Sequence, residues 1–310
     1  MTRSVFSTLL RAVLALLAVC STKFKAALGS SPVQMLVMVW AEGRLLMPGF
    51  TRRAAVLVMT GLLVACASQP PAPVVELAPT GKLRAAINFG NPILAVQDAA
   101  SGEPRGVSVD LSRELGRRLG VPVELVIFSS AGKVVEAVKA AQVDIAFVAI
   151  DPVRGADMLQ TPPYVIIEGA YLVRSDSPIK SNAEVDRAGN RIVVGNGSAY
   201  DLYLTRELKA ATLVKAPTSP TVTDLFLAQK LEVAAGVKQQ LQADAKRLPG
   251  LRLLDGRFMV INQAMGIPKG RDAGIRYLRD FIEEMKASGF VAQALARHSI
   301  EGAVVAAPQP

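Results

Sequence analysis

From Gly81 onward, short apolar runs alternate along the chain with amphipathic stretches. The first apolar run, 83–89, is followed by a segment in which Val107, Leu111 and Leu115 recur every four residues with charged residues between them. This spacing predicts an amphipathic helix, and Gly120 predicts its end. Strands that alternate with helices are typical of a parallel sheet covered by helices.

The same alternation continues to the end of the chain and divides into two series that share a pattern but not a sequence. Two α/β units without a long linker predict two lobes that share crossover strands, enclose a cleft and close by a hinge. In the final helix we expect Arg279, Glu283 and Lys286 to face water. Further strands are expected at 121–128, 144–150, 169–174, 191–195, 212–215, 232–235, 251–255 and 257–267, and helices at 132–141, 199–210, 221–230, 239–246 and along a last segment with the inner stripe Ile275, Leu278, Ile282 and Met285.

Two nearly continuous aliphatic runs, Leu9 to Val19 and Ala54 to Ala65, precede everything that alternates. Each is shorter than the ~20 apolar residues of a membrane-spanning helix and follows positive charge, which is typical of a targeting signal. The second run ends in Leu63-Val64-Ala65-Cys66, which resembles a bacterial lipobox. We therefore expect lipidation at Cys66; an unmodified cysteine in an ordinary signal peptide is the alternative.

The Pro- and Ala-rich stretch after Cys66 predicts an extended tether, because Pro lacks a backbone donor and resists helix. Met47 lies shortly before Arg52 and Arg53, so translation that starts at Met47 would make residues 1–46 a gene-start error. The expected organisation is a leader at 1–65, a tether at 66–79, lobe 1 at 80–168 and 264–302, lobe 2 at 169–263, and a disordered tail at 303–310.

The composition of the chain excludes several classes of function. The chain has 35 basic and 26 acidic residues, but the leader holds seven of the former and one of the latter, which leaves 28 and 25, or +3. Without a basic run or many aromatics, this argues against a nucleic-acid-binding protein. Cys20 and Cys66 both precede the folded body, which therefore has neither a disulfide nor a cysteine nucleophile. The single His298 is expected to be exposed, and no catalytic triad, metal-ligand spacing or phosphate-binding motif occurs, so no cofactor is expected.

Several short motifs occur in a fixed order, and together they give the stretch from Gly81 to Ile300 a family resemblance. It resembles the extracellular solute-binding proteins of family three, the polar-amino-acid type of the periplasmic binding protein type II fold. The resemblance implies an α/β protein of two lobes, each a mostly parallel sheet flanked by helices, with a ligand cleft between them. The motifs are Gly81-Lys82-Leu83-Arg84, Gly106-Val107-Ser108-Val109-Asp110, Val143-Asp144-Ile145-Ala146, Pro163-Tyr164, Leu172-Val173-Arg174-Ser175, Val194-Gly195-Asn196-Gly197-Ser198, Gly266-Ile267-Pro268-Lys269-Gly270 and Ala287-Ser288-Gly289-Phe290.

In this family an arginine a few residues after the strand that begins at Asp144 binds the ligand's carboxylate, and Arg154 occupies that place. A guanidinium suits the task because its planar fork donates two parallel hydrogen bonds to a carboxylate. The segment from Asp144 to Arg154 is two residues shorter than usual, and Asp151 replaces the usual Thr, so the loop is expected to present different donors. A solvated loop charge is the alternative for Arg154.

The segment after strand 191–195 resembles the family's second carboxylate-binding element, which supplies backbone N–H groups and a hydroxyl. Glycine lets the chain approach a ligand closely, and a helix start presents unpaired N–H groups. The alternative is helix capping by Ser198, with Asp201 three residues on, and both can hold. The ligand-binding candidates here are Asn196, Gly197, Ser198, Ala199 and Tyr200.

Asn88, Phe89 and Asn91 follow the first strand, where family members line the cleft, but these residue types could equally form a turn. Glu168 lies near the predicted crossover between the lobes. We count it among the ligand-binding candidates together with Asp151, and an ion-paired hinge residue is its alternative.

One departure from the family concerns the ligand's charge. Members that bind α-amino acids carry an aspartate for the ammonium group just after the strand that corresponds to 231–235, and here Gly236 and Val237 stand there. Burying an ammonium without a partner costs several kcal/mol. We therefore expect an anionic ligand that need not be an amino acid.

The resemblance implies a non-enzymatic substrate-binding component of an ABC importer that captures a small carboxylate-bearing solute by lobe closure. We expect a periplasmic monomer, tethered through Cys66, that delivers its solute to a permease in the inner membrane. The rival is a periplasmic dehydratase of the cyclohexadienyl or prephenate type, which needs a general acid or base, with Glu168 as its one candidate. A sensory module is a third class; the lack of a transmembrane helix and signalling domain after Ile300 counts against it.

Overall fold

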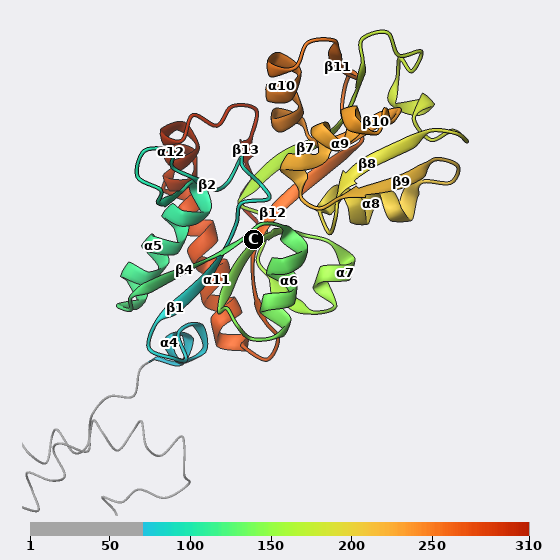
Figure 1. The fold of residues 1–310 in the computed structure, drawn as a ribbon. Coiled ribbons are helices and arrows are strands. Elements are labelled where there is room, and N and C mark those ends of the chain that lie inside the picture. Colours follow the sequence, from blue (N-terminus) through green and yellow to red (C-terminus); the bar gives the residue numbers. More distant parts are fainter. Residues whose placement is uncertain (1–70, 310) are drawn as a thin grey trace, which may run out of the picture. The chain divides into compact units, whose positions relative to one another are not determined.

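The computed structural model describes residues 71–309, and an eleven-stranded mixed sheet runs through them, beside a separate two-stranded sheet (Figure 1). Its strand order is β4-β1-β5-β12-β7-β10-β8-β9. The pairs β4-β1, β1-β5, β10-β8 and β8-β9 are parallel, whereas β7 and β12 run antiparallel to their neighbours on this path. The strands on this path are β1 (Leu83–Asn88), β4 (Val123–Phe128), β5 (Ile145–Ala149), β7 (Val165–Arg174), β8 (Arg191–Gly195), β9 (Thr212–Ala216), β10 (Val233–Val237) and β12 (Met259–Pro268).

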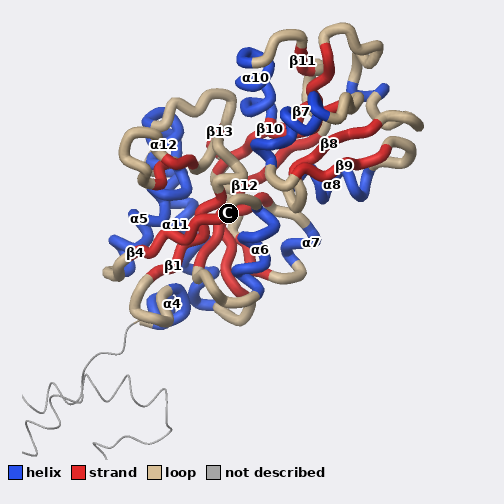
Figure 2. The backbone as a smooth tube through the Cα atoms, in the orientation of Figure 1, coloured by secondary structure: helices blue, strands red, loops and turns tan. Residues whose placement is uncertain are grey.

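Helices flank both halves of this sheet, as Figure 2 shows. We call the half with β4, β1 and β5 lobe 1, and the half with β10, β8 and β9 lobe 2. Lobe 1 carries α4 (Ala72–Leu77), α5 (Val107–Leu119), α6 (Ala131–Lys139), α7 (Pro152–Gly155), α11 (Asp272–Ala287) and α12 (Phe290–Arg297); lobe 2 carries α8 (Ala199–Glu207), α9 (Val222–Ala228) and α10 (Lys238–Arg247). Short strands complete the fold: β2 (Val96–Gln97), β3 (Pro104–Arg105), β6 (Met158–Gln160), β11 (Leu251–Leu253) and β13 (Val304–Val305).

The long strands β7 and β12 join the lobes. β7 pairs with β12 over 165–169 and then with β10 from Gly169 onward, while β12 passes from β7 to β5 at Gln263. The chain therefore enters lobe 2 along β7 and returns along β12. Two adjacent antiparallel strands between two compact halves form a hinge of the kind that permits closure.

The helix predicted from the four-residue spacing is α5, and its stripe is fully buried. Gly120 ends it in the left-handed conformation, with φ 68°. The predicted single final helix is instead two helices, because Gly289 adopts φ 76° between α11 and α12. His298, expected to be exposed, has a side chain only 11% exposed, and its Nε2 lies 2.9 Å from Oδ2 of Asp110.

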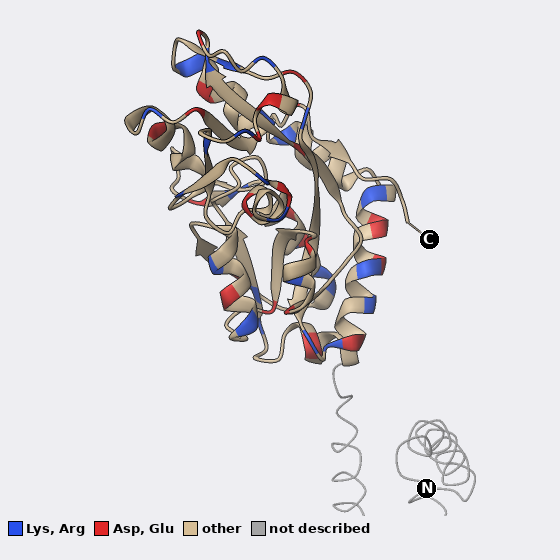
Figure 3. Ribbon diagram, turned by 90° about the vertical axis from the view of Figure 1, so that its right-hand side faces the viewer, with Lys and Arg blue, Asp and Glu red and all other residues tan. Residues whose placement is uncertain are grey.

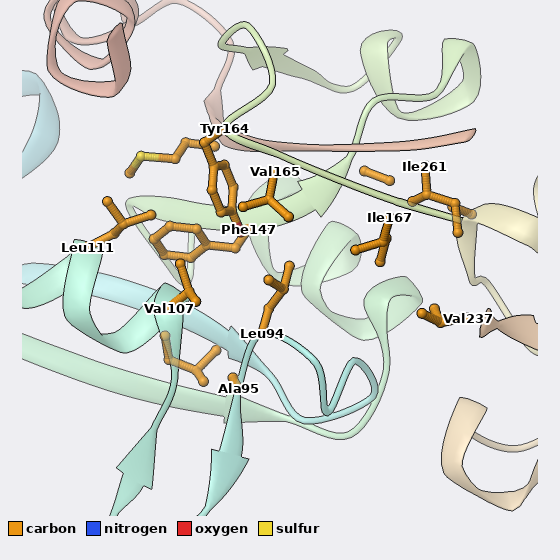
Figure 4. Packing of buried hydrophobic residues seen from close by; sticks show 14 of the residues in the cluster. Leu94, Ala95, Val107, Leu111, Phe147, Tyr164, Val165, Ile167, Val237 and Ile261 are labelled. Atoms are coloured by element: carbon orange, nitrogen blue, oxygen red, sulfur yellow. The ribbon is translucent and has the colours of Figure 1, made fainter. Parts of the chain in front are cut away.

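One buried hydrophobic cluster runs from lobe 1 through the hinge strands into lobe 2 (Figure 4). The rings of Phe147 and Tyr164 meet edge to face, with centroids 6.1 Å apart, an arrangement that stabilises aromatic pairs beyond their buried area. Ile167 of β7 and Ile261 of β12 belong to the same buried cluster. The start of the hinge is thus anchored in lobe 1.

The predicted extended tether over 66–79 is wrong for Ala72–Leu77, which forms helix α4. Pro71 and Pro73 do not prevent it, because the N–H groups at the start of a helix have no partner within it, so a proline there removes no intrahelical hydrogen bond. Leu77 is fully buried, and the Glu76 carboxylate accepts a hydrogen bond from the Gly274 amide at 2.7 Å. The predicted leader and Cys66 lie outside the described residues.

The predicted disordered tail at 303–310 is also wrong as far as Gln309. β13 pairs with β7, and the Ala306 amide donates to the Tyr164 carbonyl at 3.1 Å. Lys286, predicted to face water, has a side chain 1% exposed beneath this segment. Its Nζ donates to the carbonyls of Ala307 and Pro163, at 3.1 and 3.3 Å, and lies 2.7 Å from Oε1 of Glu283.

Both signs of charge are interspersed over the described part of the chain (Figure 3). Within residues 71–309, no helix combines the length and the apolar composition needed to cross a bilayer.

Candidate functional site

A small cavity lies where the ends of β1, β5, β10 and helix α8 meet at the hinge. Its volume is about 30 Å³, and a water needs roughly 10–15 Å³ measured in this way, so it has room for about two waters. The two lobes are therefore closed on each other. The cavity is lined by Asn88, Gly90, Asn91, Ala131, Val148, Ala149, Arg154, Ser198, Ala199, Tyr200, Ser219, Val237, Ile261 and Gln263.

Arg154 reaches this cavity because a one-turn helix follows β5. Asp151 caps α7 by accepting a hydrogen bond from the Val153 amide at 2.9 Å, and Pro152 occupies the first turn, where its ring is tolerated. Arg154 is only 2% exposed. The solvated loop charge considered for this residue is therefore not what the structure shows.

The hydrogen-bonding capacity of the Arg154 guanidinium is only partly used. Nη1 donates to the Ala149 carbonyl at 3.0 Å and Nη2 to the Gly197 carbonyl at 2.9 Å, while the buried Nε has no partner. No carboxylate forms an ion pair with Arg154 among the described residues; Asp151 pairs with Arg206 instead. Burial lowers the pKa of Arg154 to about 10, and the charge of Asp151 opposes the shift only in part. At neutral pH this is a buried cation that is not ion-paired with any carboxylate of the described residues.

The start of helix α8 faces the same cavity. The Ser198 hydroxyl accepts a hydrogen bond from the Asp201 amide at 3.0 Å, so the predicted cap is confirmed. The first N–H groups of a helix have no partner within it and carry the positive end of its dipole. In α8 these belong to Ala199 and Tyr200, which both line the cavity. This helix start and Arg154 both bring positive charge to the cavity, while the buried Asp201 carboxylate in the first turn of α8 accepts a hydrogen bond from the Gly197 amide at 2.8 Å and pairs with Lys215.

Three buried polar atoms of cavity-lining residues have no hydrogen-bond partner: Nε of Arg154, the hydroxyl of Tyr200 and Oδ1 of Asn91. Burial raises the pKa of Tyr200, although hydrogen bonding with Ser219, Ser198 and the Gly195 backbone lowers it in part, so the hydroxyl stays protonated and has these groups close by, short of ideal hydrogen-bond geometry. Leaving such groups unpaired costs about 1–3 kcal/mol each.

The structure brings six of the predicted site residues into the cavity lining: Asn88, Asn91, Arg154, Ser198, Ala199 and Tyr200. Gly197 takes part through its carbonyl, the acceptor for Arg154. Oδ1 of Asn88 also accepts from the Gly90 amide at 2.9 Å, so the turn considered for this segment forms as well.

The other predicted residues lie outside the lining. Asn196 is exposed, and Phe89 packs against the core of lobe 1. Asp151 caps α7 and forms a 2.9 Å ion pair with Arg206 of helix α8, from one lobe to the other. Glu168 lies between Lys238 and Arg257, at 2.9 and 2.7 Å, and these hydrogen bonds lower its pKa.

Sequence reasoning did not identify several lining residues as part of a site. Val148 and Ala149 end the apolar strand β5, Gln263 is a polar residue within the apolar run of β12, and Ser219 follows β9. A Cβ on Gly195 would lie 2.7 Å from the Ser219 hydroxyl, which brings these segments together. Only Gln263 could have been recognised from the sequence, because a polar residue within a buried apolar strand often has a functional or structural role. The others are Gly90, Ala131, Val237 and Ile261.

The comparisons with known proteins agree with this geometry. The profile of the bacterial extracellular solute-binding proteins, family 3, matches residues 83–300, so the chain belongs to this family. Its fold is the two-lobed periplasmic binding protein type II fold that the sequence predicted. No curated protein matches the chain.

Solved structures share the fold at low sequence identity. The solute receptor for L-cysteine of Neisseria gonorrhoeae is 22% identical, with a TM-score of 0.66 over 74% of this chain and 94% of that one. A mutant of ArgBP from T. maritima is 18% identical, with a TM-score of 0.64 over 74% and 100%. An ancestral amino acid-binding protein described as a precursor of cyclohexadienyl dehydratase is 19% identical, with a TM-score of 0.62 over 72% and 98%. Similarity at this level establishes the fold but not the ligand, which has to be inferred from the residues that line this cavity.

Proposed function

We propose that this protein is the extracytoplasmic substrate-binding component of an ABC importer and captures a small carboxylate-bearing solute by lobe closure. The observation that carries the proposal is Arg154, which is 2% exposed, lines the cavity and has an unpaired Nε. Placing a cation in such an environment is unfavourable unless a counter-charge joins it. A carboxylate would supply that charge and accept from Nε.

The helix start supports the same assignment. Ala199 and Tyr200, whose N–H groups lie in the first turn of α8 and have no partner within the helix, line the same cavity as Arg154. Amides of a helix start and a guanidinium both favour a planar, negatively charged group. No Asp, Glu or His is among the lining residues that the structure describes, and the nearby Asp201 carboxylate is already paired with the Gly197 amide and Lys215.

Closure is supported by contacts that pass from one lobe to the other. The Arg154–Gly197 hydrogen bond and the Asp151–Arg206 ion pair both join lobe 1 to lobe 2. A Cβ on Gly197 would lie 3.0 Å from Cα of Gly132, so the two backbones are nearly in contact. A solute bound between these elements would be held by both halves, and its binding energy would favour the closed state.

The dehydratase alternative lacks an acid at the cavity. Glu168 does not line it, and two cations hold the pKa of its carboxyl low, which is the opposite of what a general acid near neutral pH requires. Incubation with cyclohexadienyl acids and product analysis by mass spectrometry would reveal turnover if this alternative held.

We further propose that Cys66 is lipidated and that the protein works at the periplasmic side of the inner membrane, beside its permease. The support is the lipobox-like sequence and the family's extracellular location. Helix α4 begins only six residues after Cys66, a distance that an extended chain spans in at most about 20 Å. Mass spectrometry of the native protein and of Cys66→Ser tests this: only the native protein should carry acyl chains.

The binding proposal can be tested by a thermal-shift screen of small carboxylates, each paired with its neutral amide. We expect at least one acid to raise the melting temperature, because a ligand that binds only the folded state stabilises it. Its amide should have little effect, since it lacks the charge that Arg154 requires. Equal shifts from acids and amides would contradict the proposal.

A further inference from the structure

We propose that the C-terminal segment of the described chain is a stop that limits how far the two lobes open. We call this segment, residues 302–309, the C-terminal strap; Figure 1 shows its path from the end of α12 to β13 beside β7. The inference concerns the hinge, so it does not depend on which solute the cavity binds.

The strap and lobe 2 meet along one edge of the hinge strand β7. Val165 and Ile166 pair both with β12 and with β13, so these two strands lie on opposite edges of β7. Gly169 pairs both with β12 and with β10, so β10 lies on the same edge as β13. The steps from Ile166 to Gly169 cover about 10 Å along a strand. β13 and β10 are therefore arranged end to end beside the middle of the hinge.

The strap is fixed to lobe 1. The Ala306 amide donates to the Tyr164 carbonyl at 3.1 Å, and Nζ of Lys286 on α11 donates to the Ala307 carbonyl at 3.1 Å. Ala306 itself is buried. When lobe 2 moves about the hinge, the strap therefore stays with lobe 1.

The strap lies on the face of the hinge opposite the cavity. Ile261 and Gln263 of β12 line the cavity, whereas Asn262 between them lines a groove together with Ile166 of β7 and strap residues 306–309. Successive side chains of a strand point to opposite faces, and directly paired residues point to the same face. Asn262 and Ile166 are such a pair. The groove and the strap residues that line it are thus on the reverse face.

The start of helix α10 lies on this reverse face as well. Glu168 follows Ile166 by two positions on β7 and so points to the same face. Its carboxylate pairs with Lys238, the first residue of α10, at 2.9 Å. Leu241 of α10 belongs to the same buried cluster as Ala170, the next residue of that face of β7. Helix α10 of lobe 2 and the strap of lobe 1 therefore share one face of the hinge.

The two elements come together at Gly302. A Cβ on Gly302 would lie 3.2 Å from Nε2 and 3.6 Å from Cγ of Gln239, the second residue of α10. Gly302 also has φ 70°, a conformation that L residues rarely adopt. The strap thus passes the start of α10 with room for a glycine and little more.

This contact limits opening because of the face on which it lies. The lobes part on the cavity face when β7 and β12 bend, and a sheet that bends open on one face closes on the other. Opening therefore moves α10 toward the strap and presses Gln239 against the Gly302 backbone. The long Gln239 side chain can yield by changing its rotamer, but β7 holds the strap backbone. We expect opening to end where the start of α10 meets the strap.

Double electron–electron resonance on the full chain without solute tests this inference. Spin labels at Glu136→Cys on α6 and Glu207→Cys on α8, two exposed positions on opposite lobes, report the width of the cleft. Cys20 and Cys66 are replaced by Ser in all variants so that only these sites are labelled.

Two variants should shift the distances in opposite directions. Gly302→Asn adds a side chain at the contact, and Asn tolerates the left-handed conformation, so the distances should become shorter and less widely spread. Gln239→Ala makes room beside the strap, so the distribution should extend to distances longer by a few ångströms. The double variant should return toward the native distribution, because the truncation frees the room that the added side chain takes.

Matched controls separate this contact from general effects of the substitutions. Gly270 has φ 80° and nothing within 4 Å of its Cβ position, and Gln242 is exposed on α10. Gly270→Asn and Gln242→Ala should therefore leave the distances unchanged. Native distances in both Gly302→Asn and Gln239→Ala, or equal changes in the controls, would overturn the inference. The proposed function would stand in either case, because it is tested by solute binding.

Discussion

Nη2 of Arg154 lies 2.9 Å from the carbonyl oxygen of Gly197, so the buried cation of lobe 1 is hydrogen-bonded to the turn that starts helix α8 in lobe 2. A carbonyl oxygen carries only part of a negative charge, and Nε of the same guanidinium has no partner. The closed structure therefore satisfies Arg154 incompletely. An anionic solute would complete the pairing and hold the lobes together.

Gly197→Ala should weaken solute binding by about tenfold, because the new Cβ would lie 3.0 Å from Cα of Gly132 and impede closure. Gly189→Ala is the matched control: Gly189 also has a positive φ, 90° against 69°, but nothing lies within 4 Å of its Cβ position. Both variants should lose about 1 kcal/mol of unfolding free energy to left-handed strain. Calorimetry should find weaker binding in Gly197→Ala alone, and equal affinities would argue against close approach of the lobes at this point.

Arg206→Gln should speed solute release by a factor of about 2 to 5, because its ion pair with Asp151 joins the lobes and such half-exposed pairs contribute up to about 1 kcal/mol. High salt should reduce the difference from the native protein, since it screens the pair. Arg191→Gln is the control, as Arg191 pairs with Glu232 within lobe 2. Stopped-flow measurements would show a faster release in both variants if the effect were merely one of surface charge.

Local sequence patterns predicted much of the fold. Most of the wrong predictions concern residues that are buried by segments distant in the sequence. The four-residue spacing located α5, and Ser198 with Asp201 located the start of α8. The same spacing placed Lys286 in water, because nothing in a helix pattern reveals that residues 304–309 return to cover it. Helix α4 was missed for a related reason: Pro-rich composition predicts extension locally, whereas the burial of Leu77 is a tertiary effect.

Part of the cavity lining was also predicted from the sequence, and part was not. Arg154 and the start of α8 could be found because each belongs to a motif with a fixed place in the order of elements. Asp151 looked like a ligand-binding residue, since sequence does not show that Arg206 lies 2.9 Å away. Ser219 and Gln263 come from separate strands, and only the folded sheet brings them together.

Lys286→Ala should lower the unfolding free energy by about 2 kcal/mol, because the side chain is 1% exposed and its loss leaves Glu283 without its cation. Lys286→Met should recover part of the loss, since it restores the buried aliphatic stem. Urea denaturation measures both, and Lys209→Ala at an exposed position is the control. Hydrogen exchange should also increase at Ala306, whose amide bonds to Tyr164 beneath the same segment. Unchanged exchange would mean that Lys286 does not hold the tail.

Glu168→Gln should reduce stability at neutral pH by about 1 kcal/mol, because the ionised carboxylate pairs with Lys238 and Arg257. Its pKa is lowered in the folded state, so this contribution is present above the unfolded-state pKa and is lost as the pH falls through the folded-state pKa. The denaturation curves of variant and native protein should therefore converge in acid. Solute affinity should not change, since Glu168 does not line the cavity. Glu301→Gln, at an exposed position, is the control. A loss of solute affinity in Glu168→Gln alone would show that Glu168 contributes to ligand binding.

The most direct measurement is the calorimetric affinity of the best carboxylate for the native protein, Arg154→Leu and the exposed control Arg117→Leu. We expect Arg154→Leu to lose about 2–5 kcal/mol of binding free energy, the usual consequence of truncating a buried charged partner. Arg117, whose side chain is 70% exposed on α5, should be dispensable. A fully retained affinity in a folded Arg154→Leu protein would show that the anion binds elsewhere and would contradict the account.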